Sequence, residues 1–143
     1  MTIQPVICNN NPNNETIQWA CNYLTSHGYE LKTKLPEIVQ DTPWSYVLRF
    51  ATSEGLIYLK QTLEQLALEA TIIQTLRDQF HASVLTVITY NAELNCFLMN
   101  DSGKSLRSIL KQNFDEALLC KTVDQFTSLQ IAVAEHVDVF FLI

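Results

Sequence analysis

The stretch GLIYLKQT, residues 55–62, decides the fold because it is typical of a buried strand that carries one lysine near its end. Side chains alternate in direction along a strand, so Tyr58 and Lys60 share one face of the sheet. Ile57 and Leu59 share the opposite face, which leaves both faces largely apolar. A lysine in such a run either reaches water at the strand end or meets an anion.

The segment after this strand, residues 63–79, has the apolar spacing of a helix, with Leu66, Ile73 and Leu76 on one stripe. Glu69 lies inside that stripe rather than on the solvated side. A carboxylate directed toward the apolar side needs a cation, and Lys60 is the nearest one in the chain. We therefore expect a salt bridge between Lys60 and Glu69.

The rest of the chain predicts an α+β domain with a five-stranded antiparallel sheet. An amphipathic helix with Asn14 as its N-cap and Gly28 as its stop comes first; its stripe is Ile17, Ala20, Cys21 and Leu24. The other predicted strands cover residues 29–40, 45–52, 83–90 and 95–100. A short helix at 105–113 and a long one from about Phe114 to the end follow. We expect three regions. They are an N-terminal helical segment at 1–34, a lobe that contains the sheet at 35–101, and a hinge with the start of a further helical lobe at 102–143.

Composition narrows the class of protein and its partners. With 143 residues and 48% hydrophobic content, the chain predicts one soluble domain, and without a membrane span or secretory signal we expect it in the cytoplasm. The net charge of −6, with dispersed basic residues, argues against a nucleic-acid interface. The cysteines are too scattered for a zinc site, so we expect mostly buried free thiols at Cys8, Cys21, Cys96 and Cys120.

Three motifs in order carry a family resemblance. They are WSYVLRFATSEGLIYLKQT at 44–62, LALEATIIQTL at 66–76 and CFLMNDSGKSLRSIL at 96–110. Together they resemble the amino-terminal lobe of the aminoglycoside phosphotransferase-like family, which has the protein kinase fold and includes choline and homoserine kinases. The segment SLQIAVAEHVDVFFL, 128–142, is similar to a helix that follows in many bacterial members.

The resemblance implies an ATP site on one face of the sheet. Lys60 would contact the phosphates and Glu69 would hold it, as in protein kinases. The segment DTPWSY at 41–46, which includes Ser45, would take the place of the loop over the phosphates, although it has no glycine. Val47 and Tyr58 would cover the adenine, unless they are ordinary core residues.

The stretch FLMNDSG, 97–103, would be the hinge between two lobes. There the resemblance places Met99, the Asn100 carbonyl and the Ser102 amide at the adenine edge. The alternative for NDSG is simple turn chemistry between a strand and a helix. Gly103-Lys104-Ser105 matches the end of the P-loop pattern GxxxxGK[ST]. The first glycine of that pattern is replaced by Leu98, so we reject a P-loop ATPase.

The catalytic residues of the resembled family lie in a carboxy-terminal lobe, in a His-x-Asp loop with a downstream Asn and a metal-binding Asp. His136-Val137-Asp138 spells the motif, but Phe126, Val133, Val137 and Phe140 continue a helical stripe through it, so we interpret it as a helix turn. We therefore expect a nucleotide-binding lobe without the catalytic lobe, inactive alone, with magnesium bound only in a full-length protein.

Two partner hypotheses follow from the apolar helix at the end of the chain. It would pack either against the second lobe or against another copy of the chain. A different class of function is a non-catalytic protein-interaction module that keeps the same fold. The acceptor substrate cannot be inferred, because its contacts in this family come chiefly from the other lobe.

Overall fold

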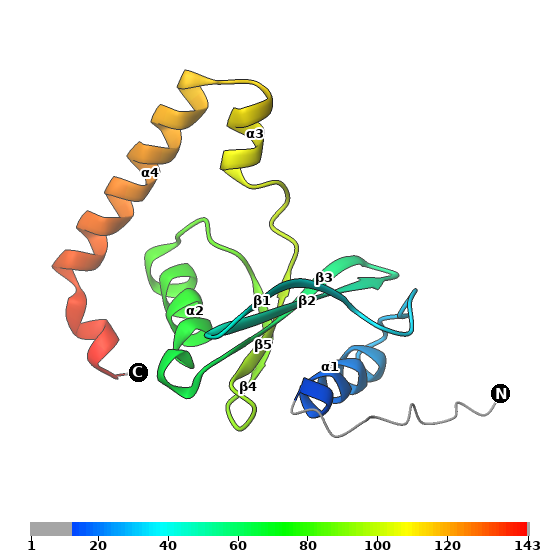
Figure 1. The fold of residues 1–143 in the computed structure, drawn as a ribbon. Coiled ribbons are helices and arrows are strands. Elements are labelled where there is room, and N and C mark those ends of the chain that lie inside the picture. The colour runs from blue at the N-terminus through cyan, green and yellow to red at the C-terminus, as the bar shows by residue number, and fades with distance from the viewer. Residues whose placement is uncertain (1–12, 143) are drawn as a thin grey trace.

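The computed structural model describes residues 13–142 and has the predicted α+β architecture, with a five-stranded antiparallel sheet (Figure 1). The strands are β1 (Glu37–Thr42), β2 (Ser45–Thr52), β3 (Gly55–Thr62), β4 (Val87–Asn91) and β5 (Cys96–Asn100). Their order across the sheet is β1-β2-β3-β5-β4. The strand that carries Lys60 is therefore the central one.

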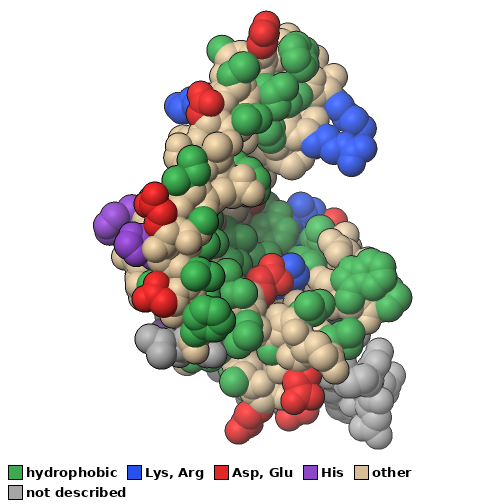
Figure 2. Space-filling view, turned by 90° about the vertical axis from the view of Figure 1, so that its left-hand side faces the viewer, with side chains coloured by type: hydrophobic (Ala, Val, Ile, Leu, Met, Phe, Trp, Pro, Cys, Tyr) green, Lys and Arg blue, Asp and Glu red, His purple; other side chains and the backbone are tan. Residues whose placement is uncertain are grey.

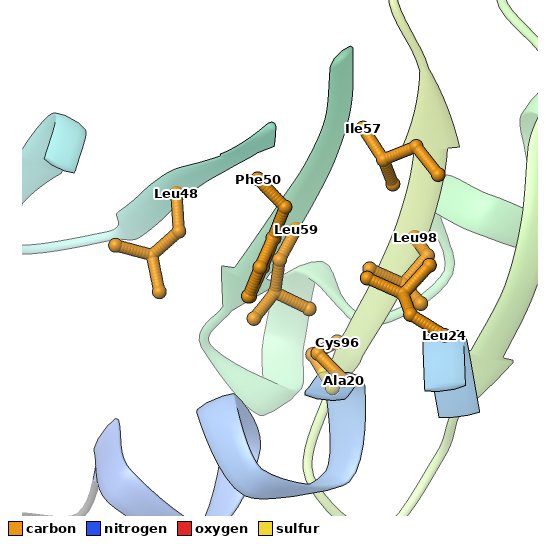
Figure 3. Packing of buried hydrophobic residues seen from close by; sticks show 8 residues of the cluster. All are labelled: Ala20, Leu24, Leu48, Phe50, Ile57, Leu59, Cys96 and Leu98. Carbon is orange, nitrogen blue, oxygen red and sulfur yellow. The ribbon is translucent and has the colours of Figure 1, made fainter. Parts of the chain in front are cut away.

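One face of the sheet is covered by α1 (Asn13–Ser26). Ala20 and Leu24 of this helix are fully buried against the sheet, as the predicted stripe requires. Figure 3 shows Leu24 next to Leu98 of β5 and Ala20 beside Cys96. The sheet side of this core consists of Leu48, Phe50, Ile57, Leu59, Cys96 and Leu98.

The ends of α1 were predicted unequally well. Gly28 has φ +85°, and the following Tyr29 amide donates to the Leu24 carbonyl at 3.0 Å, which is the predicted left-handed stop. The start was misplaced, because Asn13 is already helical and Asn14 therefore lies inside the helix rather than at its N-cap.

The helix that carries Glu69 is shorter than predicted. A 3-10 turn, η1 (Glu64–Leu66), comes first, and α2 runs over Glu69–Phe80. Leu66 therefore lies outside the helical stripe and is 48% exposed. Neither start has a side-chain cap, so the sequence held no signal for the break.

Two strands were also predicted too long. The first predicted strand, 29–40, is reduced to β1 and one isolated bridge between Leu31 and Thr52. Pro36, which has no amide hydrogen for a ladder, separates the two. The fourth begins at Val87 rather than at residue 83, because residues 81–86 form an irregular connection from α2.

After β5 the chain forms an arm of three helical elements, α3 (Leu106–Gln112), α4 (Glu116–Glu135) and the 3-10 helix η2 (Val137–Leu142). Figure 1 shows α3 and the start of α4 projecting away from the sheet, with η2 returning toward α2. Phe140 stacks on Phe80 of α2, with ring centroids 5.9 Å apart. No residue of α4 is buried.

The predicted continuous helix from Phe114 to the end is wrong in its last part. The helix ends at Glu135, and the backbone amide of His136 donates a hydrogen bond to the Val133 carbonyl. His136 and Asp138 therefore belong to the break and to η2 rather than to one helix turn. Beyond this break, Phe140 of η2 stacks on Phe80 of α2. Between residues 13 and 142, no helix combines the length and the apolar character needed to cross a bilayer.

Candidate functional site

The salt bridge that the sequence predicts is present. The Lys60 ammonium lies 2.7 Å from the Glu69 carboxylate. β3 supplies the lysine near its end, and Glu69 is the first residue of α2, so the two elements meet at this pair. The side chains are 24% and 36% exposed. A ligand can therefore reach the ammonium while the carboxylate holds it in place.

Strand pairing places further residues around Lys60 on the same face. Lys60 lies opposite Val47 of β2 and opposite Phe97 of β5. Both neighbours are buried, with 8% and 4% exposure. In the next row Tyr58 lies opposite Met99, and both are half-buried. Lys60 thus lies between two buried apolar residues, with two half-buried side chains in the next row.

Ser45 contributes an unsatisfied polar group to this face. It begins β2, shares the face of Val47, and is only 7% exposed. Its hydroxyl has no hydrogen-bond partner in the described part of the chain. Buried hydroxyls are rarely left without a partner, because losing the bond to water costs about 1–3 kcal/mol. The Thr16 hydroxyl of α1, on the other side of the sheet, is also buried without a partner among residues 13–142, so this feature does not by itself distinguish the Lys60 face.

The turn before Ser45 contains no glycine and is closed by hydrogen bonds to a threonine side chain. The Thr42 hydroxyl donates to the Ser45 carbonyl at 2.9 Å and accepts from the Ser45 amide at 3.1 Å. Pro43 and Trp44 form the tip between these two residues, and Trp44 is 57% exposed. The segment predicted to lie over the phosphates is thus a tight turn closed by a threonine.

An ion pair that the sequence analysis missed borders the site. Arg49 of β2 lies between Glu37 of β1 and Tyr58 of β3 in one row across the sheet. Its guanidinium donates to the Glu37 carboxylate, and this bond, together with one to Tyr58, raises the pKa of Arg49. Counting alternate residues from Ser45 through Val47 would have placed Arg49 on this face.

The predicted hinge residues lie at the end of β5 and just after it. The Asn100 amide donates to the Thr86 carbonyl at 3.0 Å, and the Asp101 carboxylate accepts from the Gly103 amide at 3.0 Å. Ser102 is exposed beyond the end of β5. A hollow of about 530 Å³ lies here, lined by Tyr29, Glu54, Gly55, Leu56, Ile57, Asn100 and Asp101.

This hollow is separate from the Lys60 site. Asn100 pairs with Ile57, whose side chain lies on the face that α1 covers. A second hollow, of about 170 Å³, lies between α2 and the β4–β5 hairpin and includes Phe97 and Ala70. Neither lining contains Lys60. The Lys60 side chain is 24% exposed, whereas Val47 and Phe97 beside it are buried.

The cysteines and acidic groups form no metal centre within residues 13–142, where no group of three or more potential ligands is found. Cys96 and Cys120 are free thiols, as predicted, but Cys96 is buried whereas Cys120 is exposed. Cys21 is half-buried, and Cys8 lies outside the described residues. Burial raises the pKa of the Cys96 thiol to about 12. Cys96 is thus inert core rather than a reactive group.

Comparison with known proteins leaves the family open: no family model matches the chain, and no curated protein matches it.

Proposed function

We propose that this chain is the nucleotide-binding lobe of an ATP-dependent small-molecule phosphotransferase of the aminoglycoside phosphotransferase-like family. The observation that carries the proposal is the 2.7 Å contact between Lys60 and Glu69 on a partly open face. A strand lysine held by a glutamate from the next helix is the arrangement with which kinases position the phosphates of ATP.

The remaining residues take roles that follow from their places around Lys60. The Lys60 ammonium would donate to phosphate oxygens, and the orphan Ser45 hydroxyl would donate to the same group. Val47, Tyr58 and Met99 would cover the adenine. The Asn100 carbonyl and the Ser102 amide would bind its edge, since they lie at and beyond the end of β5.

We expect the chain alone to transfer no phosphate. The catalytic and metal-binding carboxylates of the family lie in the other lobe, and binding the nucleotide from one side does not replace them. Magnesium, which in a full-length protein would neutralise charge on the phosphates, has no assigned ligand in this chain. Magnesium-dependent turnover of ATP that Lys60→Ala abolishes would contradict this expectation.

The binding proposal is tested by calorimetric titration of the chain with ATP. Lys60→Ala should weaken binding by about tenfold or more, because a charged hydrogen bond is worth about 1.5–3 kcal/mol. Lys121→Ala is the matched control, since it removes an exposed lysine from α4 and should leave the affinity unchanged. Equal affinities of the Lys60→Ala variant and the wild type would remove Lys60 from the site.

A second candidate function is a protein-interaction module with the same fold. The absence of any buried residue in α4, a helix of 20 residues, favours it. If the wild-type chain fails to bind ATP, while the surface of α4 still mediates association, the second candidate replaces the first.

A further inference from the structure

The helix α2 is held at its two ends by different parts of the chain. Its first residue, Glu69, binds Lys60 of β3 at 2.7 Å. The ring of its last residue, Phe80, stacks on Phe140 of η2, with the ring centroids 5.9 Å apart and the planes 12° apart. The His136 ring, at the break between α4 and η2, lies 6.4 Å from the same Phe80 ring. The helix thus connects the centre of the sheet with the end of the arm.

Both contacts lie on one side of α2. Glu69, Ile73, Leu76 and Phe80 follow one another at helical intervals and therefore share one stripe. Ile73 and Leu76 are half-buried between the two ends. An α-helix of 12 residues is about 18 Å long and curves only gently, so a tilt set at one end of the stripe carries the other end with it.

The start of α2 is packed less firmly than a protein core. Leu68, the residue before the helix, makes no side-chain cap bond. The hollow of about 170 Å³ between α2 and the β4–β5 hairpin is lined on the helix side by Ala67, Leu68, Ala70 and Thr71. Protein interiors leave few voids of this size, so the first turn of α2 has room to tilt toward the hairpin. Local packing therefore leaves the direction of Glu69 partly unset.

The other end of α2 is fixed by the backbone and by the arm. The His81 amide and the Ala82 amide both donate to the Leu76 carbonyl, the second at 3.0 Å, and so close the helix. Phe80, directly before this closure, is half-buried against Phe140. Figure 2, which faces the side that α4 occupies in Figure 1, shows the surface hollowed between the upper part of the arm and the rest of the molecule. The arm therefore meets α2 toward η2, where the stacked rings lie.

The salt bridge is too exposed to set the tilt of α2 by itself. The Lys60 and Glu69 side chains are 24% and 36% exposed, so water competes for both charges. We propose that Phe140 is a positioning residue for the Lys60 site. Its stack on Phe80 fixes the tilt of α2 and thereby the direction from which Glu69 holds the Lys60 ammonium. The consequence for ATP rests on the proposed function, whereas the effect on the salt bridge does not.

The NMR signal of the Lys60 Cε methylene tests the proposal without any nucleotide. Glu69→Gln removes the charge partner and gives the signal of an unpaired Lys60. Phe140→Ala should move the Lys60 signal toward that of Glu69→Gln. Phe140→Tyr, which keeps a flat ring, should leave the signal at its wild-type position, and so should Phe141→Ala, the matched control that removes the neighbouring, 80% exposed ring. An unchanged signal in Phe140→Ala, or an equal shift in Phe141→Ala, would overturn the proposal.

Calorimetric titration with ATP tests whether the effect reaches ligand binding. Phe140→Ala should weaken ATP binding by about threefold or more. In the Lys60→Ala background the same change should add no further loss, because it acts through that lysine. Losses that simply add would show that Phe140 affects the site by another route and would overturn its positioning role. A wild type that does not bind ATP would remove the proposed function, and the Lys60 signal would still decide whether Phe140 positions the pair.

Discussion

The two faces of the central sheet differ in the side chains that they hold. On the α1 face, Leu48, Leu59 and Leu98 are 1% exposed or less, and the Thr16 hydroxyl of α1 is buried without a partner among the described residues. On the other face, the Lys60–Glu69 pair is partly open and the Ser45 hydroxyl is buried without a partner. The α1 face therefore holds most of the apolar core, whereas the other face holds the charged pair.

The largest expected effect belongs to the α1 face. Leu98→Ala should lower the free energy of unfolding by about 2–5 kcal/mol, because it removes a fully buried side chain and leaves a cavity. Met99→Ala, next to it on β5 but half-buried on the Lys60 face, should cost much less. Urea unfolding measures both variants, and equal losses would break the distinction between the faces.

A second prediction uses the buried thiol on the α1 face. Cys96 has a pKa of about 12 when folded and an ordinary value of 9.0. Above pH 9 the unfolded chain loses this proton while the folded chain keeps it, so stability should fall by up to about 1.4 kcal/mol per pH unit until about pH 12. Below pH 9 this contribution does not vary.

The alkaline loss is measured by urea unfolding between pH 8 and 10.5. Cys96→Ala should make the slope of stability against pH shallower, whereas Cys120→Ala, which changes an exposed thiol, should leave it as in the wild type. Identical slopes in all three proteins would show that the Cys96 thiol ionises as easily in the folded chain as in the unfolded one.

The salt bridge should contribute little to stability. Lys60 and Glu69 are 24% and 36% exposed, and water screens such pairs, so their coupling energy should lie below about 1 kcal/mol. A double-mutant cycle with Lys60→Ala and Glu69→Gln in urea measures it. A coupling above about 2 kcal/mol would mean that the pair is a structural element of the fold.

The sequence predicted the parts of this fold that depend on local periodicity. Alternation along residues 55–62 placed Lys60, and helical spacing placed Glu69 on the side facing it, so their contact followed. The break at η1 and the end of α4 at Glu135 were not predictable, because no capping side chain marks η1 and the stacking of Phe140 on Phe80 joins distant segments. Alternation along β2 would have placed Arg49 on this face. Glu37 and Phe97 became part of the site only through strand register, which residue spacing alone does not fix.

The smallest effect on stability is expected at Ser45, whose buried hydroxyl has no hydrogen-bond partner among residues 13–142. Removing a buried hydroxyl that has a partner costs stability, but removing one without a partner should be neutral or slightly favourable. Ser45→Ala should therefore change the free energy of unfolding by less than about 0.5 kcal/mol.

If the hydroxyl binds phosphate, the same variant should weaken ATP binding about fivefold or more, since a neutral hydrogen bond contributes about 1 kcal/mol. Thr52→Ala is the control, because the Thr52 hydroxyl is equally buried but donates to the Gly55 carbonyl at 2.8 Å. Thr52→Ala should lower the free energy of unfolding without weakening the binding of ATP. Loss of stability in Ser45→Ala would show that the hydroxyl is satisfied within the fold, and this face would then no longer indicate a ligand through that residue.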